Sequence, residues 1–322
     1  MLKRIQVKVV FLMTFMEFNA LFPTEKAVVD YFIRIRYPNG IVCNHCGSTK
    51  AYARKGNIKV FDCGDCNNTF SPFRDTIFEK SSTSLIKWMY AIHLILNGKK
   101  GISGLQLQRE IGVTYKTAWR MLQQIRIAMN NEEHREFVDT VVEIDETYVG
   151  GKPRKGNRKD DNPPDDPPTG DGGKKKTGRG TDKTPVIGVV SRDDKAVFAR
   201  VALPNAKGQK LTATQLIDVL RVVSKPENNN IVMTDEFSGY SPLAKHNYVH
   251  LRIDHSKMFS DGEIHTNNIE GFWSILKRGI FGIYHHISVK HMQRYIDEFC
   301  FRYNHRKDDD VFDRVLRQAL LA

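Results

Sequence analysis

The sequence predicts an α/β protein in which a mixed β-sheet domain follows a small cysteine-rich module and a helical region. Three observations support this prediction. Apolar runs typical of strands recur between residues 141 and 253, two Cys-x-x-Cys pairs stand near the N-terminus, and residues 81–130 show three runs of helical periodicity. The predicted order is an N-terminal helical segment (1–40), the cysteine module (41–75), the helical region (81–130), the sheet domain (136–306) and a C-terminal tail (307–322).

Length, charge and cysteine usage narrow the class of protein. A chain of 322 residues suggests two or three domains. The formal net charge of +12 favours a polyanionic partner, although charge alone indicates only non-specific attraction. Four of the five cysteines fall in one cluster, which argues for a metal in a reducing compartment rather than for a disulfide framework.

The sequence gives no sign of a membrane partner. No apolar run reaches the roughly 18 residues that a membrane-spanning helix needs. The first residues imitate a signal peptide, because Lys3, Arg4 and Lys8 precede an apolar run, but no small-residue cleavage site follows. We therefore expect the protein to stay in the cytoplasm.

The cysteine module is predicted to be a zinc ribbon. Cys43-Asn44-His45-Cys46 is followed after sixteen residues by Cys63-Gly64-Asp65-Cys66. Each pair can donate two thiolates from a tight turn, so Cys43, Cys46, Cys63 and Cys66 would close one tetrahedral structural zinc site. A redox role would need a thioredoxin-like context, which is absent. With four thiolates available, His45 is expected to point to solvent or DNA rather than to the metal.

The helical region is predicted to contain a helix-turn-helix. One helix is expected from Phe18 to Tyr37 in the N-terminal segment, and three more at 81–96, 103–111 and 115–129. A short helix, a glycine-containing turn and a longer helix are typical of this DNA-binding motif. The last helix would direct outward three polar side chains, Lys116, Arg120 and Gln123. A basic outer face that only confers solubility is the alternative.

Two aspartates are expected where strands of the sheet domain end. Asp145 ends the alternating run that begins at Val141, and Asp235 follows the apolar run 230–234. Taken singly, an acid at a strand end is more often a turn or cap residue. Taken together, acids on separate elements suit a site for two Mg²⁺ or Mn²⁺ ions, because such ions prefer carboxylate oxygens.

A helix predicted from about residue 268 to 281 adds a third polar group to this site. Asn267, Glu270 and Lys277 share one of its faces at spacings i, i+3 and i+10. Glu270 would complete the metal ligands, and Lys277 would face DNA phosphates. Between the first acid and the next strand, residues 152–183 carry no apolar side chain and are predicted to be a disordered insertion.

Three blocks of this sequence resemble those of bacterial insertion-sequence transposases of the DDE type, in the group with an N-terminal zinc ribbon and an ISXO-type transposase domain. The blocks are Asp145 to Lys152, Thr234-Asp235-Glu236, and His265 to Ser274 with Lys277-Arg278. The resemblance runs from about Phe15 to about Arg306. It implies a ribonuclease-H-like fold, with which the predicted order of strands and helices agrees.

The resemblance also implies magnesium-dependent strand cleavage and joining, with Asp145, Asp235 and Glu270 as metal ligands. Some relatives use Asn or His as the third ligand, so Asn267 stands as the alternative. We favour Glu270 because it is anionic and because Lys277 follows it by seven residues. Lys277 and Arg278 would contact DNA, and Trp273 would either stack on a DNA base or end, or pack the helix against the sheet.

The expected function is therefore that of a transposase acting on double-stranded DNA, both element ends and target, as a homo-oligomer in the nucleoid of a bacterial cytoplasm. One alternative is a DNA-binding regulator that descends from a transposase and does not catalyse. Retention of all three acids favours the enzyme. A structure-specific nuclease is a weaker third reading, which an assay for DNA joining would separate from the first.

Overall fold

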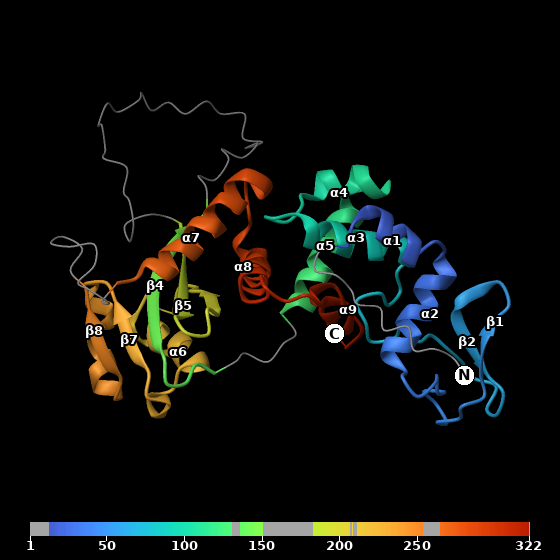
Figure 1. Ribbon diagram of the computed structural model, residues 1–322, viewed down its shortest axis with the longest axis horizontal. Coiled ribbons are helices and arrows are strands. Elements are labelled where there is room, and N and C mark those ends of the chain that lie inside the picture. Colours follow the sequence, from blue (N-terminus) through green and yellow to red (C-terminus); the bar gives the residue numbers. More distant parts are fainter. Residues whose placement is uncertain are drawn as a thin grey trace. The chain divides into compact units, whose positions relative to one another are not determined.

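The computed structural model describes residues 13–130, 136–150, 183–206, 208, 211–253 and 265–321 (Figure 1). The chain forms two units, Met1–Glu133 with Asp297–Ala322, and His134–Ile296. The insertion expected at 152–183 falls, up to residue 182, outside the described residues. No helix in the described ranges is long and apolar enough to cross a membrane.

The zinc ribbon is a small antiparallel sheet in the first unit. Its strands β1 (Ala51–Arg54), β2 (Asn57–Cys63) and β3 (Thr69–Phe70) pair in the order β1-β2-β3. Phe61 and Phe70 are buried with Cys43 and Cys63 in a cluster of their own. The ribbon therefore has only a minimal apolar core, as expected for a module that a metal stabilises.

The predicted N-terminal helix is two helices, α1 (Phe15–Leu21) and α2 (Glu25–Arg36). Thr24 begins the second helix, because its hydroxyl accepts a hydrogen bond from the Ala27 amide at 3.2 Å. Pro23, just before this cap, cannot continue a preceding helix without loss of a hydrogen bond. The chain therefore breaks between Leu21 and Glu25, and the single predicted helix becomes two.

The three following helices are α3 (Leu85–Asn97), α4 (Gly104–Ile111) and α5 (Tyr115–Met129). The hydroxyls of Ser84, Ser103 and Thr114 cap their N-termini. Gly112 ends α4 with a φ of +60°, in the left-handed region that favours glycine. The last two helices have the bounds predicted for the helix-turn-helix.

The C-terminal segment is not a tail. Helix α9 (Val311–Leu321) buries five apolar residues in the core of the first unit, together with Phe32 and Trp88. The five are Phe312, Val315, Leu316, Ala319 and Leu320. Their spacing is that of an amphipathic helix. The expected domain boundary at 306 also shifts, because the second unit ends at Ile296, within helix α8 (Val289–Asn304).

The segment from 297 onward is also anchored to the first unit by a buried ion pair. Arg126 of α5 donates from Nε to Glu298 of α8 at 2.7 Å, and both side chains are almost fully buried. Arg302 donates to the second oxygen of Glu298 at 2.9 Å and also to the carbonyl of Gly98 at 3.1 Å. These bonds fix the end of α8 beside the helical core.

In the described part of the second unit, five strands form a mixed sheet in the order β6-β5-β4-β7-β8. The strands are β4 (Val141–Val149), β5 (Thr184–Ser191), β6 (Val197–Val201), β7 (Ile231–Thr234) and β8 (Val249–Arg252). β4 pairs antiparallel with β5 and parallel with β7. This order, with helices on both faces, is the ribonuclease-H-like arrangement that the sequence predicts.

Alternation along β4 assigns each helix to one face of the sheet. Val142 and Ile144 are buried in one cluster with Leu216 and Leu220 of α6 (Ala213–Val223). Glu143 and Asp145 point to the opposite face, where both side chains hydrogen-bond residues of α7 (Asn267–Gly279). Figure 1 shows α7 lying across β4 and β5. A π-helical turn (Ile280–Tyr284) continues α7.

Candidate active site and zinc centre

Four sulfur atoms converge in the zinc ribbon. Within the described residues, Cys43, Cys46, Cys63 and Cys66 are the set of at least three metal-ligating side chains whose ligand atoms all lie within 4.8 Å of one another. Two sulfur pairs are 3.7 Å and 3.6 Å apart. A tetrahedron with Zn–S bonds of about 2.3 Å has edges of about 3.8 Å, so the cluster fits zinc. The predicted single structural zinc is confirmed.

The backbone around the cluster favours thiolates. The amides of Cys66 and Asp65 lower the pKa of Cys63 to about 6. The amide of Asn68 similarly lowers the pKa of Cys66. A thiolate is the form that binds zinc, so these turns favour Cys63 and Cys66 as ligands. The Ser48 amide lowers the pKa of Cys46, but hydrogen bonds with the other three thiols together with burial outweigh that effect and raise this pKa to about 12. His45 is exposed and lies outside the cluster, as expected.

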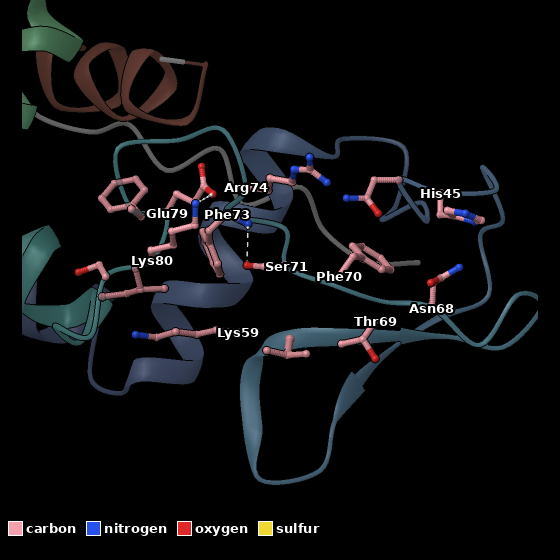
Figure 2. Close-up of a pocket in the computed structure, with 15 residues that line it drawn as sticks. His45, Lys59, Asn68, Thr69, Phe70, Ser71, Phe73, Arg74, Glu79 and Lys80 are labelled. Carbon is pink, nitrogen blue, oxygen red and sulfur yellow. Dashed lines mark hydrogen bonds and ion pairs between the residues drawn. The ribbon is translucent and has the colours of Figure 1, made fainter.

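A pocket of about 570 Å³ opens beside the ribbon in the first unit (Figure 2). Its lining includes three cations, Lys59, Arg74 and Lys80. Each lies within 4 Å of a carboxylate of the protein, those of Glu25, Asp75 and Glu79 respectively. Because its charges are matched within the protein, the pocket alone does not indicate an anionic ligand.

The predicted DNA-facing residues of α5 divide into two groups. Lys116 and Arg120 are exposed, whereas Gln123 is 2% exposed. The expectation that Gln123 faces DNA is thus wrong for this structure. Helix α9 packs against α5, a contact that periodicity along α5 could not predict.

Asp145 lies in β4, and Asp235 directly follows the neighbouring parallel strand β7. The parallel register pairs Val141 with Ile231, Val142 with Val232 and Glu143 with Met233, and the same offset, continued past the last of these pairs, would set Asp145 level with Asp235. Asp145 is not at a strand end as predicted. It lies in the middle of β4, which continues to Val149 through its pairing with β5, whereas β7 stops at Thr234.

Trp273 hydrogen-bonds Asp145, and Gly188 on the adjacent strand leaves space for the indole ring. The Trp273 indole donates from Nε1 to Asp145 Oδ2 at 3.0 Å. Gly188 of β5 stands opposite Asp145, and a Cβ there would approach Trp273 to 2.6 Å. Trp273 is 4% exposed, so it packs α7 against the sheet, and the stacking on DNA considered above does not fit this structure.

Burial raises the pKa of Asp145 to about 7, and the negative charges of Glu146 and Asp235 add to the effect. Glu146 points to the other face, where it accepts a hydrogen bond from the Tyr240 hydroxyl at 2.9 Å. Asp235 accepts one from the amide of Phe237 at 3.0 Å. Negative charges therefore lie near one another at the end of β7, and a bound divalent cation would reduce their mutual repulsion.

The polar residues of α7 share an exposed face. Asn267, Glu270, Lys277 and Arg278 are all exposed. Glu270 accepts a hydrogen bond from the Thr266 hydroxyl at 3.1 Å. Among the described residues, Asp145, Asp235 and Glu270 are not gathered within 4.8 Å as the cysteines are. The structure therefore places the two aspartates on or directly after neighbouring strands, where the charge of Asp235 acts on Asp145, and it places Glu270 on the helix α7.

Sequence reasoning missed Glu143 and Arg192. Glu143 is fully buried on the same face of β4 as Asp145 and pairs with Arg192 at 2.7 Å. Its carboxylate also accepts hydrogen bonds from the amides of Asn268 and Ile269 at the start of α7. The available signal was an acid inside an apolar strand, two residues before Asp145, since such a charge needs a buried partner.

Two transposase sequence profiles match the chain. That of the ISXO2-like transposase domain matches residues 137–304, and that of the transposase zinc-ribbon domain matches residues 23–69. An uncharacterized protein in transposable element ISH50 of Halobacterium salinarum is 29% identical over 307 residues, which cover 93% of this chain and 95% of that one. An uncharacterized transposase-like protein of Haemophilus influenzae is 31% identical over 104 residues, which cover 32% and 78%.

Among solved structures, the Mos1 strand transfer complex matches 72% of this chain and 74% of its own at 16% identity, with a TM-score of 0.31. A pre-cleavage Mos1 transpososome matches at 14% identity over 72% of this chain and 77% of its own, with a TM-score of 0.27. These values are too low to bear on activity. The transposase-domain match over residues 137–304, more than half of the 322 residues, shows that the chain belongs to the ISXO2-like transposase family.

Proposed function

We propose that this transposase cleaves DNA at the ends of an insertion sequence and joins the freed ends to target DNA, with two Mg²⁺ or Mn²⁺ ions. The observation that carries the proposal is that Asp145 lies in β4 and Asp235 directly after its parallel neighbour β7, with the charge of Asp235 contributing to the raised pKa of Asp145. Carboxylates from two neighbouring strand segments are a donor set that fits hard divalent cations.

Asp145 and Asp235 would hold the metal ions, together with Glu270 or Asn267 from the first turn of α7. When bound, the ions would polarise the scissile phosphodiester and activate the attacking oxygen. Trp273 donates to one oxygen of Asp145 and so orients the carboxylate that would bind the ion. Lys277 and Arg278, on the exposed side of α7, would contact DNA phosphates.

DNA binding would use α5 of the helix-turn-helix, from which Lys116 and Arg120 project near the N-terminus. The net charge of +12 supports attraction to the DNA backbone. Because an insertion sequence has two ends, we propose that identical chains assemble on DNA. The protein would then act in the bacterial cytoplasm, at the nucleoid.

The test is incubation of the full-length, zinc-loaded protein with a labelled element end and target DNA in Mg²⁺. Nicked products followed by joined products are expected. Binding without any product would favour a regulator that descends from a transposase, and nicking without joining would favour a nuclease. Omission of the divalent cation should stop both steps and leave DNA binding in place.

A further inference from the structure

Glu143 lies inside the sheet and forms an ion pair with Arg192 there. Its side chain is fully buried, and four donors surround it. Oε2 accepts from the amides of Asn268 at 2.9 Å and Ile269 at 3.0 Å. Oε1 accepts from Asn268 Nδ2 at 2.8 Å and from Arg192 Nε at 2.7 Å. Both carboxylate oxygens are thus committed to donors on other elements.

Two of these donors are first-turn amides of α7, which have no partner within the helix. Such amides are usually capped by the residue before the helix, but the side chain of Thr266 makes no capping bond here. Its hydroxyl donates to Glu270 instead, at 3.1 Å. The cap of α7 is therefore supplied from β4, and its negative charge also suits the positive end of the helix.

Arg192 makes a second connection to the same turn. Its Nη2 donates to the carbonyl of His265 at 2.6 Å and lies 3.0 Å from His265 Nδ1. A guanidinium has no acceptor, so Nδ1 must accept that bond. Arg192 directly follows β5. It thereby binds the backbone that leads into α7 through Nη2 and binds Glu143 through Nε.

We propose that Glu143 is a positioning residue for the catalytic metal site. It locks the first turn of α7 onto β4, two residues from Asp145 and on the same face. That turn carries both Asn267 and Glu270, so the lock sets the third ligand whichever of them serves. The proposal rests on the proposed function, because it assigns Glu143 to the same metal site.

A purely structural role would also make Glu143 sensitive to substitution, so the test measures metal affinity. Glu143→Gln keeps the size of the side chain but removes its charge and turns one acceptor into a donor that faces donors. In full-length, zinc-loaded protein titrated calorimetrically with Mn²⁺, we expect Mn²⁺ affinity to fall about tenfold or more. Hydrogen exchange at the amides of residues 268–270 should accelerate.

The matched control is Glu298→Gln. Glu298 is equally buried and arginine-paired but belongs to the first unit. It should lower the melting temperature and leave Mn²⁺ affinity unchanged. Asp145→Asn should remove the titrated site and so identifies it. Arg192→Lys is a milder change. It keeps the positive charge but loses the second nitrogen, which bonds His265 while Nε bonds Glu143. It should weaken Mn²⁺ binding several-fold, and it serves if Glu143→Gln does not fold.

Wild-type Mn²⁺ affinity in folded Glu143→Gln, or in Arg192→Lys if the first variant does not fold, would overturn the proposal while the proposed function stands. A wild-type protein that binds no Mn²⁺ and yields no DNA product would overturn the proposed function, and this inference with it. If Glu298→Gln also lost Mn²⁺ affinity, the loss in Glu143→Gln would reflect general destabilisation, and the role of Glu143 would be structural only.

Discussion

The zinc centre and the acid site are assembled over very different lengths of chain. Four cysteines between Cys43 and Cys66 converge through one small antiparallel sheet. The proposed acid site (Asp145, Asp235, and Glu270 or Asn267) would draw on β4, the end of β7 and α7, which are brought near one another only by sheet register and helix packing. A metal site whose ligands come from two short motifs can be assigned ligand by ligand from spacing, whereas a site built on long-range pairing can be assigned only in outline.

The substitution that should separate the two sites most clearly is Asp145→Asn. We expect DNA cleavage to fall about 10³-fold or more, because metal-held transition-state stabilisation is worth several kcal/mol. Zinc content should not change. Initial cleavage rates and elemental analysis measure the two effects. Asp218→Asn, an exposed acid on α6, is the control and should retain full activity. A fully active Asp145→Asn would remove this residue from the site.

Cys63→Ser makes the complementary change, at the zinc centre. It should abolish zinc binding and unfold the ribbon, since the binding free energy of a structural zinc is largely local folding free energy. The sheet unit should keep its own thermal transition. Zinc content and unfolding curves provide the measurements. Cys300→Ser, outside the cluster, should retain about one zinc. Retained zinc in the Cys63 variant would refute the ligand set.

The third ligand decides how far the acid site extends along α7. Glu270→Gln should abolish cleavage and joining and leave DNA binding intact, because it removes a charge and little volume. Asn267→Ala should lower activity only about tenfold if it supports the site from one turn away. Rates for both variants on one labelled end make the comparison. The reverse order of effects would assign the third position to Asn267.

The raised pKa of Asp145 predicts a stability effect in metal-free buffer. The folded state binds the proton more tightly than the unfolded state does, so ionisation of Asp145 destabilises the fold. The penalty is absent below the ordinary pKa near 4, grows as pH rises, and is complete above about 7. Asp145→Asn should therefore stabilise the protein by on the order of 2–4 kcal/mol at pH 8.

Chemical denaturation of both proteins at pH 4 and pH 8 checks this effect. Equal stability gains at the two pH values would mean that burial of the charge is not the cause. Added Mn²⁺ should cancel the advantage of the variant, because the ion stabilises only the protein that keeps the carboxylate.

The smallest expected effect concerns α5. Replacing Lys116 and Arg120 together by Ala should weaken DNA binding and reduce the slope of log affinity against log salt by up to about two units. Binding measured across a salt series gives the slope. The control replaces Lys26 and Lys245, two exposed lysines elsewhere. An unchanged slope in the α5 variant would leave Lys116 and Arg120 as solvated surface.

The sequence by itself determined what local rules govern. The spacing of Cys43, Cys46, Cys63 and Cys66 specified the zinc ribbon, because turns alone bring those thiolates together. Helical periodicity and capping residues gave α4 and α5 their bounds. Alternating apolar runs located the strands of the sheet unit, and the three polar residues of α7 fell on one exposed face, as their spacing required.

Tertiary structure decided what depends on distant segments. Gln123 is buried although its helical position predicted an outward side chain, and α9, far along the chain, packs against α5. Trp273 faces Asp145 because Gly188 of another strand leaves room for it. Glu143 caps α7 only because the sheet places β4 beneath that helix. Each outcome depends on which remote surface covers a residue, and periodicity along one segment carries no information about that.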